Sequence, residues 1–433
     1  MNKRFLLILL LPFAISFGCA PLNFYAKLDP FIISGNYKAA ADIVETEKKQ
    51  YEGMHELLYY FDKGSLLQML GDYKASATNL DKAEETIDSL YTKSATKELS
   101  SFLSNDMNLP YEGEDFEQVM VNTIKALNYM YLNDYEGARV EARKVNNRLN
   151  LLSDRYEGKN KYKDDAFARY LSAFSYEAEN NLNDAYIDYK KSYKAYLDYG
   201  GLYGTQVPNE LKRDLLRVSE ALNFTDDYAN YKNTFPNISY IKQSELNTAG
   251  EVLIIIYDGM APYKINNFVN TSVYNEKTKK NTIIKVAFPI FVTRNYAVNT
   301  VTADINGRQF RSFIAEDINT MAIKNLEEKN ALISLKAIAR ATAKYLAKES
   351  ISTNVKNSWL DLAMDVYNLA SEQADTRSWR TLPARFHIIK MQLVPGRYEV
   401  KLKLNMANGT VREQSIQLQL KEKQKKAVPI FAF

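Results

Sequence analysis

The sequence predicts an α+β protein in which an N-terminal all-α helical solenoid is followed by a mixed α+β domain with antiparallel strands. Three observations support this prediction. A short turn phrase recurs in the first half of the chain, strand-like patterns replace it after about residue 250, and 433 residues exceed the usual size of one hydrophobic core. We therefore expect a helical domain over 26–235, a linker over 236–249 and an α+β domain over 250–433.

The first 18 residues have the pattern of a secretory leader. Lys3 and Arg4 precede the apolar stretch FLLILLLPFAISF (5–17). A membrane-spanning helix needs about 20 apolar residues, so this stretch is too short to be one. We expect it to be the apolar region of a signal peptide.

The end of the leader resembles a bacterial lipobox. Gly18 precedes Cys19, the only cysteine, whereas Ser16 and Phe17 depart from the usual Leu and small residue. The resemblance implies a lipoprotein signal peptide over 1–18, acylation (palmitate) at Cys19 and a short lipid tether over 19–25. The alternative is a plain leader or an unprocessed anchor. Ala20 follows the cysteine instead of Asp, which in the enterobacterial sorting rule implies the outer membrane, facing the periplasm.

Four turn phrases organise the first half: GNYKAAADIV (35), GDYKASATNL (71), NDYEGARVEA (133) and NNLNDAYIDY (180). A small residue follows each turn by five positions, and in three copies another precedes it by seven. The small residues that we expect at close helix contacts are Ala40, Gly64, Ser76, Ala126, Ala138, Ala173 and Ala185.

This pattern resembles the tetratricopeptide repeat (TPR), although only the first interval, 36 residues, approaches the 34-residue period. The resemblance implies stacked helical pairs with a concave face. We expect that face to bind an envelope protein by its shape; the alternative is that the array only positions the second domain. The 31 tyrosines are expected at seams between helices, with the hydroxyl groups in water.

The second half changes to strands. EVLIIIYDG (251–259) predicts a buried strand closed by an Asp-Gly turn, and NTIIKVAFPIF (281–291) predicts a strand at an edge or bulge because of Pro289. Two helices are expected over 316–350 and a third from about Val355 to Ala374. Alternation on either side of Asn408-Gly409 predicts a half-buried antiparallel hairpin near the C-terminus.

Charged and aromatic residues concentrate in one segment between these helices and the last strands. The segment contains Asp375, Arg377, Trp379, Arg380 and Arg385. Arg and Trp are frequent where binding energy is concentrated, so the segment is a candidate partner-binding site. The alternative is a structural clamp, with Asp375 paired to an arginine and Trp379 packed beneath it.

Several phrases together carry a wider resemblance: YEGEDFEQVM, IIIYDGMAPYK, VAFPIF, AIARATAKYL and ADTRSWRTLPARF, in this order. From about Tyr111 onward the chain resembles an uncharacterised family of bacterial envelope lipoproteins with TPR repeats and a C-terminal α+β domain. The resemblance implies a cell-wall setting, with peptidoglycan-synthesis lipoproteins as candidate partners.

The sequence contains no pattern for catalysis, metal or cofactor. Its two histidines are His55 and His387, and HExxH, G-x-S-x-G, P-loop and G-x-G-x-x-G patterns are absent. A balance of 56 basic and 52 acidic residues argues against nucleic acid as a partner. We therefore expect a membrane-tethered, non-enzymatic scaffold; the alternative is a peptidoglycan-binding or cell-wall-modifying protein acting through 375–385.

Overall fold

The structure is a computed structural model that describes residues 24–94, 107, 109–158, 160, 162–275, 279–352 and 373–433. Cys19, the leader and most of the helix expected from Val355 lie outside these residues. The α+β class is confirmed: helices fill the first half of the described chain, and antiparallel strands dominate the second.

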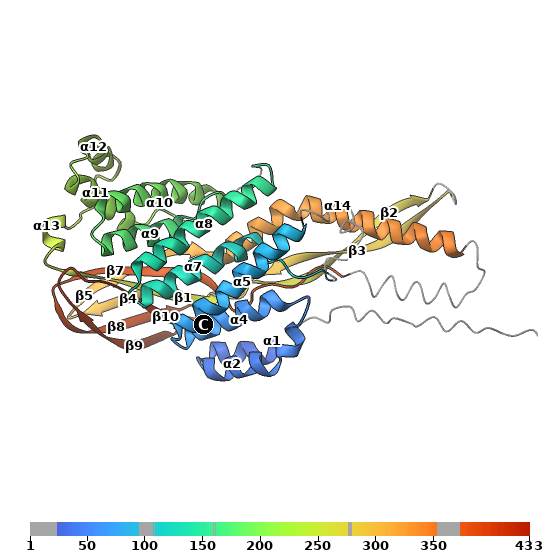
Figure 1. Cartoon of the computed structure of the whole chain (residues 1–433), viewed down its shortest axis with the longest axis horizontal. Helices are drawn as coiled ribbons and strands as arrows, with labels where there is room; N and C mark the ends of the chain where they lie inside the picture. The colour runs from blue at the N-terminus through green and yellow to red at the C-terminus, as the bar shows by residue number, and fades with distance from the viewer. Residues whose placement is uncertain are drawn as a thin grey trace, which may run out of the picture.

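The helices of the first half form consecutive antiparallel pairs, and this region is TPR-like (Figure 1). Their bounds are α1 Tyr25–Ile33, α2 Tyr37–Thr46, α3 Lys48–Tyr51, α4 Glu56–Met69, α5 Tyr73–Ser94, α7 Asp115–Tyr131, α8 Tyr135–Arg155, α9 Ala166–Ala178, α10 Leu182–Leu202, α11 Asn209–Ala221, α12 Thr225–Thr234 and α13 Gln243–Leu246.

One turn chemistry joins the helices of the four pairs that the turn phrases predict. A residue with positive φ (Gly35, Gly71, Asn133, Asn180) is followed by an Asn or Asp whose side-chain oxygen accepts a backbone N–H of the next helix. The pair α11/α12 turns at Asn223, with φ of 56°, but lacks such a capping side chain. That pair has no turn phrase, which is why the sequence pattern missed it.

The small residues lie where paired helices touch. Ala126, Ala138, Ala173 and Ala185 are at most 1% exposed. At Gly64 an added Cβ would lie 2.7 Å from Leu80 Cδ2, so the approach of α4 to α5 requires glycine there.

The strands of the second half form two four-stranded sheets and a separate hairpin. The sheet orders are β10-β1-β7-β6 and β5-β4-β8-β9, and β2 pairs with β3. The bounds are β1 Gly250–Met260, β2 Tyr263–Asn275, β3 Lys280–Val292, β4 Val298–Ile305, β5 Arg308–Arg311, β6 Phe313–Asp317, β7 Pro383–Leu393, β8 Gly396–Met406, β9 Val411–Leu420 and β10 Lys425–Ala432.

β1 is buried on both faces because it lies in the middle of three layers. Leu253, Ile255 and Tyr257 face the helical array, whereas Ile254 and Ile256 face the second sheet. This explains a continuous apolar run instead of an alternating one. The strand continues through Asp258 to Met260, so the Asp-Gly turn predicted at its end is wrong.

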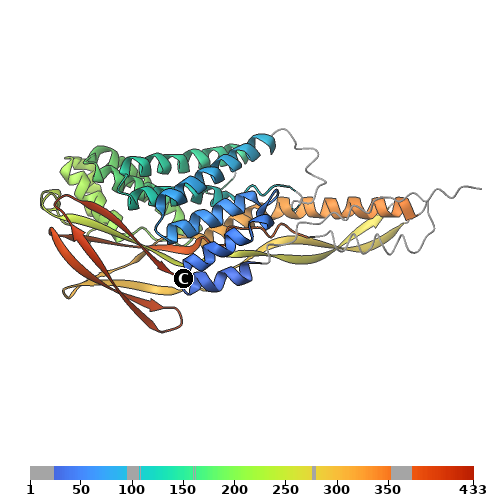
Figure 2. The same cartoon turned by 60° about the horizontal axis from the view of Figure 1, so that its bottom comes forward.

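A long arm projects beyond the helical pairs in both views (Figures 1 and 2). It consists of the β2–β3 hairpin and α14, Ile318–Ser352. The prediction of two helices over 316–350 is wrong, because no Gly or Pro interrupts one continuous helix there. Pro289 lies in β3 of this hairpin, which pairs only with β2 among the described strands.

The helical array and the first sheet share one hydrophobic core. Phe167 of α9 lies 5.2 Å from Phe386 of β7 between ring centroids, and the Tyr131 and Tyr257 hydroxyls are 2.9 Å apart. Tyr196 of α10 donates to the Ala315 carbonyl at 2.9 Å. Many tyrosine hydroxyls therefore bond across this interface instead of facing water.

This shared core corrects the expected binding face. In a TPR array the first helices line the concave side, and here α7 and α9 are first helices that are buried along nearly their whole length. The chain's own sheet covers them (Figure 2). A partner cannot occupy that face without displacing the sheet.

Candidate functional site

The segment from Asp375 to Leu382, which we call the strap, lies across the first helices of the array. Trp379 is 1% exposed and stacks on Phe61 of α4, with 4.1 Å between ring centroids and 13° between planes. Its indole N–H lies 3.0 Å from the Ser65 Oγ, and its backbone N–H donates to Glu117 Oε1 at 2.7 Å. Trp379 therefore joins the strap to α4 and α7.

Arg377 fixes two loops of the helical region. Its Nε and Nη2 donate to the two oxygens of Asp375 at 2.8 and 2.6 Å. Its Nη1 donates to the carbonyls of Met54 at 2.9 Å and Leu109 at 2.8 Å. The Arg377 charge, together with its hydrogen bonds, keeps the pKa of Asp375 below its ordinary value although burial opposes this.

Arg380 and Arg385 lie apart from this cluster. Arg380 donates to Asp29 of α1 at 2.9 Å. Arg385 belongs to β7 and donates to Asp258 Oδ2 at 2.7 Å, and the same oxygen lies 3.1 Å from His387 Nε2. The five candidate residues thus bind three different parts of the fold.

These contacts do not form a ligand site. Trp379, Arg377 and Arg385 are 1%, 6% and 9% exposed, and each uses its polar atoms within the protein. The arrangement contains the Asp375–arginine pair and the buried Trp379 that a structural clamp would have. The strap joins the helical array to the sheet. Because these side chains are already engaged within the protein, their burial argues against 375–385 as a peptidoglycan site.

A second buried cluster joins α9 and α11 to the sheet. Arg217 lies 2.5 Å from Glu177 and 2.9 Å from Asp214, and Lys425 lies 2.8 Å from Glu177 and 2.5 Å from Glu251. Burial raises the pKa of Glu251, but the ammonium groups of Lys390 and Lys425 outweigh it and lower that pKa to about 2. The charges compensate one another, which is the arrangement of a structural network.

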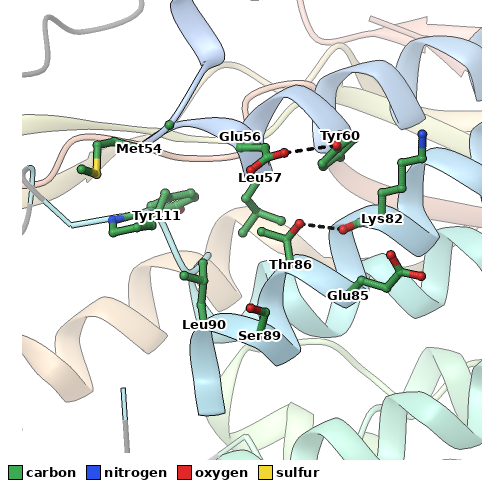
Figure 3. Close-up of a pocket in the computed structure, with 12 residues that line it drawn as sticks. Met54, Glu56, Leu57, Tyr60, Lys82, Glu85, Thr86, Ser89, Leu90 and Tyr111 are labelled. Atoms are coloured by element: carbon green, nitrogen blue, oxygen red, sulfur yellow. Dashed lines mark hydrogen bonds between the residues drawn. The ribbon is translucent and has the colours of Figure 1, made fainter. Parts of the chain in front are cut away.

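A groove of about 510 Å³ lies beside α4 and α5 (Figure 3). Its lining combines apolar, hydroxyl and charged side chains, and Leu57, Leu90 and Tyr111 point toward its centre. The full lining is Gly53, Met54, Glu56, Leu57, Tyr60, Lys82, Glu85, Thr86, Ser89, Leu90, Pro110 and Tyr111.

The strap holds one wall of this groove. Arg377 binds the Met54 carbonyl, and the Tyr111 backbone N–H donates to that same carbonyl at 2.9 Å. Because Arg377 also binds the Leu109 carbonyl, it ties the loop before α4 to the loop before α7. The groove is therefore built jointly by the helical array and the C-terminal half.

Polar side chains on the opposite wall of the groove are partly exposed and are held in place by contacts with one another. The Tyr60 hydroxyl donates to Glu56 at 3.3 Å, and Lys82 Nζ lies 5.9 Å from the centre of the Tyr60 ring. Thr86 donates to the Lys82 carbonyl at 2.7 Å. Such a mixed surface suits an extended peptide, with apolar contacts at the floor and polar contacts at the rim. No motif in the sequence marks it, because its residues come from separate segments.

The described part of the chain shows no metal centre and no membrane-spanning helix. No group of three or more His, Cys, Asp or Glu side chains within it is placed to hold a metal ion. No helix in the same residues has both the length and the apolar character needed to cross a bilayer.

Comparison with solved structures finds similarity over about half of this chain. The structure of BtubC (BKLC) from P. vanneervenii is 12% identical over 50% of this chain and 78% of its own, with a TM-score of 0.34. MamA from AMB-1 is 13% identical, with coverages of 50% and 92% and a TM-score of 0.29. A kinesin light chain of Podosopora anserina with nearly identical TPR-like repeats is 12% identical, with coverages of 49% and 92% and a TM-score of 0.31.

Likeness at this level does not extend to what those proteins bind. No protein-family model and no curated protein sequence matches the chain. The geometry of the groove and of the interfaces therefore carries the functional argument.

Proposed function

We propose that this protein is a lipid-anchored, non-enzymatic scaffold of the bacterial cell envelope that binds a protein partner in the groove beside α4 and α5. The observation that carries the proposal is the construction of that groove: Arg377 of the C-terminal half binds the Met54 and Leu109 carbonyls beside it. The groove thus depends on the assembled protein. A TPR-like region whose first-helix face is covered needs another surface for a partner, and this groove provides one.

The partner that fits is an extended segment of a protein. Leu90 offers a partly exposed apolar contact beside the buried Leu57 and Tyr111, and Glu56, Glu85 and Lys82 line the same groove. The excess of acidic side chains favours a segment with apolar residues and a Lys or Arg. Lipoproteins of peptidoglycan synthesis are the candidates that the sequence resemblance names.

The anchor is proposed from the leader. If Cys19 is acylated, only residues 20–23 separate it from Phe24, the first residue of the described fold. An extended chain spans about 3.3–3.6 Å per residue, so α1 would be held within roughly 20 Å of the bilayer. The partner is then expected close to the same membrane, which we propose is the outer membrane on its periplasmic side.

Site-specific photo-crosslinking tests the groove. A photo-reactive amino acid at Ser89 of the full-length chain is expected to yield a discrete adduct in cells, and adding Leu90→Glu is expected to reduce that adduct at least tenfold. The matched control is the same amino acid at Val411, an exposed position of β9 that is 50% accessible. Equal adducts at both positions, or none at Ser89, would sink the proposal.

A further inference from the structure

The distal arm has an exposed apolar face. In the hairpin, Phe268, Tyr274 and Ile283 are 44%, 54% and 74% exposed. The register pairs Phe268 with Ala287, Ser272 with Ile283 and Tyr274 with Asn281. Because paired residues point to the same side of a hairpin and alternate positions share a face, Phe268, Tyr274 and Ile283 lie on one face.

The opposite face of the hairpin packs on α14. Val286 and Ile284 form a small apolar cluster with Ala337 and Ala341, and the Thr282 and Tyr345 hydroxyls are 2.9 Å apart. The arm therefore has its own packing contacts, and its exposed side chains are not needed for that core. Exposed aromatic and aliphatic side chains gathered on one projecting element indicate a docking surface.

The arm carries a net positive charge. Its two strands and its helix (263–275, 280–292 and 318–352) contain nine basic and three acidic residues, whereas the rest of the chain contains 47 basic and 49 acidic residues. Lys285 Nζ lies 3.9 Å from the centre of the Phe268 ring, on the exposed face. Among the described residues, no ion pair involves Lys279, Lys285 or Lys336.

We propose that the distal arm docks on the surface of a bilayer that contains anionic lipids. Aromatic and aliphatic side chains enter the interfacial region while lysines bind the headgroup phosphates, and each lysine near an anionic surface contributes on the order of 1 kcal/mol. The combination of exposed apolar side chains with a net positive charge selects this occupant over an uncharged apolar protein surface. The proposal concerns the arm alone and does not depend on acylation of Cys19 or on the groove.

Vesicle binding of the chain from Phe24 onward tests the proposal. This chain keeps every described residue and both hydrophobic cores. We expect it to sediment with vesicles of phosphatidylglycerol and phosphatidylcholine in equal parts, and to bind at least tenfold more weakly to pure phosphatidylcholine or when salt is raised. Equal binding to both kinds of vesicle would overturn the electrostatic part of the proposal.

Variants distinguish vesicle binding through the arm from vesicle binding through the rest of the surface. The double variant Phe268→Ser/Ile283→Ser and the double variant Lys279→Glu/Lys285→Glu are each expected to reduce vesicle binding about tenfold, with unchanged circular dichroism. The control is Lys401→Glu/Lys403→Glu on β8, at the other end of the molecule (Figure 1), which should bind as the parent does. Parent-like binding by both arm variants, or loss in the control alone, would refute the proposal.

A spectroscopic readout places the contact. With no other cysteine in the chain from Phe24, an environment-sensitive fluorophore on Ile283→Cys should shift to the blue on anionic vesicles, whereas the same label on Val411→Cys should not. Self-association detected by ultracentrifugation without lipid, together with loss of that association in Phe268→Ser/Ile283→Ser, would instead assign the face to a second copy of this chain and reject the membrane.

Discussion

Trp379 and Phe61 come from opposite halves of the chain and stack with 4.1 Å between ring centroids. The pair lies where the strap crosses α4, beside the hydrogen bond from the Trp379 backbone N–H to Glu117. The strap and the helices α4 and α7 therefore meet around one aromatic pair.

Trp379→Ala should destabilise the whole protein, because it removes a fully buried ring and leaves Ser65 and Phe61 facing a cavity. The expected loss is about 3–5 kcal/mol in the free energy of unfolding, measured by urea titration. Trp379→Phe keeps the ring contact and loses the indole N–H, so it should cost about 1–2 kcal/mol. If the alanine variant unfolds at the same urea concentration as the parent, the strap is not a clamp.

Glu177→Gln tests how much charge compensation in the buried network contributes to the free energy of unfolding. The change leaves Arg217 and Lys425 with less negative charge in a buried setting, and we expect a loss of about 3–5 kcal/mol. The control is Asp42→Asn, whose partner Lys38 is 74% exposed; it should cost less than about 1 kcal/mol. Similar losses in the two variants would contradict the structural role of the network.

Stability should depend on pH through Asp62. Its carboxylate accepts hydrogen bonds from Tyr25, Tyr51 and Thr381, which lower its pKa, but burial outweighs them and raises that pKa to about 6. An unfolded Asp titrates near about 4. The folded protein thus holds this proton more tightly, so the contribution to stability is full below about pH 4 and is lost as pH rises through about 6.

The size of that loss is on the order of 3 kcal/mol. Urea titrations at a series of pH values check it, with Asp62→Asn as the comparison, because an amide cannot titrate. The free energy of unfolding of the parent, minus that of the variant, should fall between about pH 4 and 6. A difference that is constant with pH would show that folding does not raise the pKa of Asp62.

Gly64→Val should force α4 away from α5. The added side chain starts 2.7 Å from Leu80 Cδ2, so overpacking should cost about 1–3 kcal/mol or more. Gly201→Val in α10 is the matched control, since nothing lies within 4 Å of a Cβ there, and its effect should stay within about 0.5 kcal/mol. Thermal unfolding of the two variants distinguishes them.

Cys19→Ser tests the lipid anchor. Acyl chains contribute about 0.8 kcal/mol per buried CH₂, so their loss should release the protein from membranes into the soluble fraction of cells and abolish incorporation of labelled palmitate. Ser16→Ala keeps the cysteine and should leave labelling in place. Label that persists in Cys19→Ser would disprove the assignment.

Local pattern was enough to predict the four helical pairs that carry a turn phrase. A residue with positive φ followed by a capping Asn or Asp is a property of a few adjacent residues, so the turns at Gly35, Gly71, Asn133 and Asn180 could be read directly from the sequence. The C-terminal hairpin was readable for the same reason, since Asn408-Gly409 and the alternation of β8 and β9 are local.

Local sequence pattern could not show which segments cover the face formed by the first helices of the array. β1 contributes both to the core shared with the array and to the core between the two sheets, and which segments it meets depends on pairings between residues far apart in the chain, such as Ile256 with His387. Asp258 looked like a turn residue, yet it binds Arg385 because β7 lies beside it.

The sequence by itself determined the helical pairs, their turns and the strand-rich second half, because short-range sterics and capping decide these features. Only the tertiary structure decided that the strap is a clamp, that the sheet covers the array, and that a groove and a basic apolar arm stay exposed. These features depend on contacts between residues far apart in the chain. The apolar face of the helical array and that of β1 are removed from water by packing against each other.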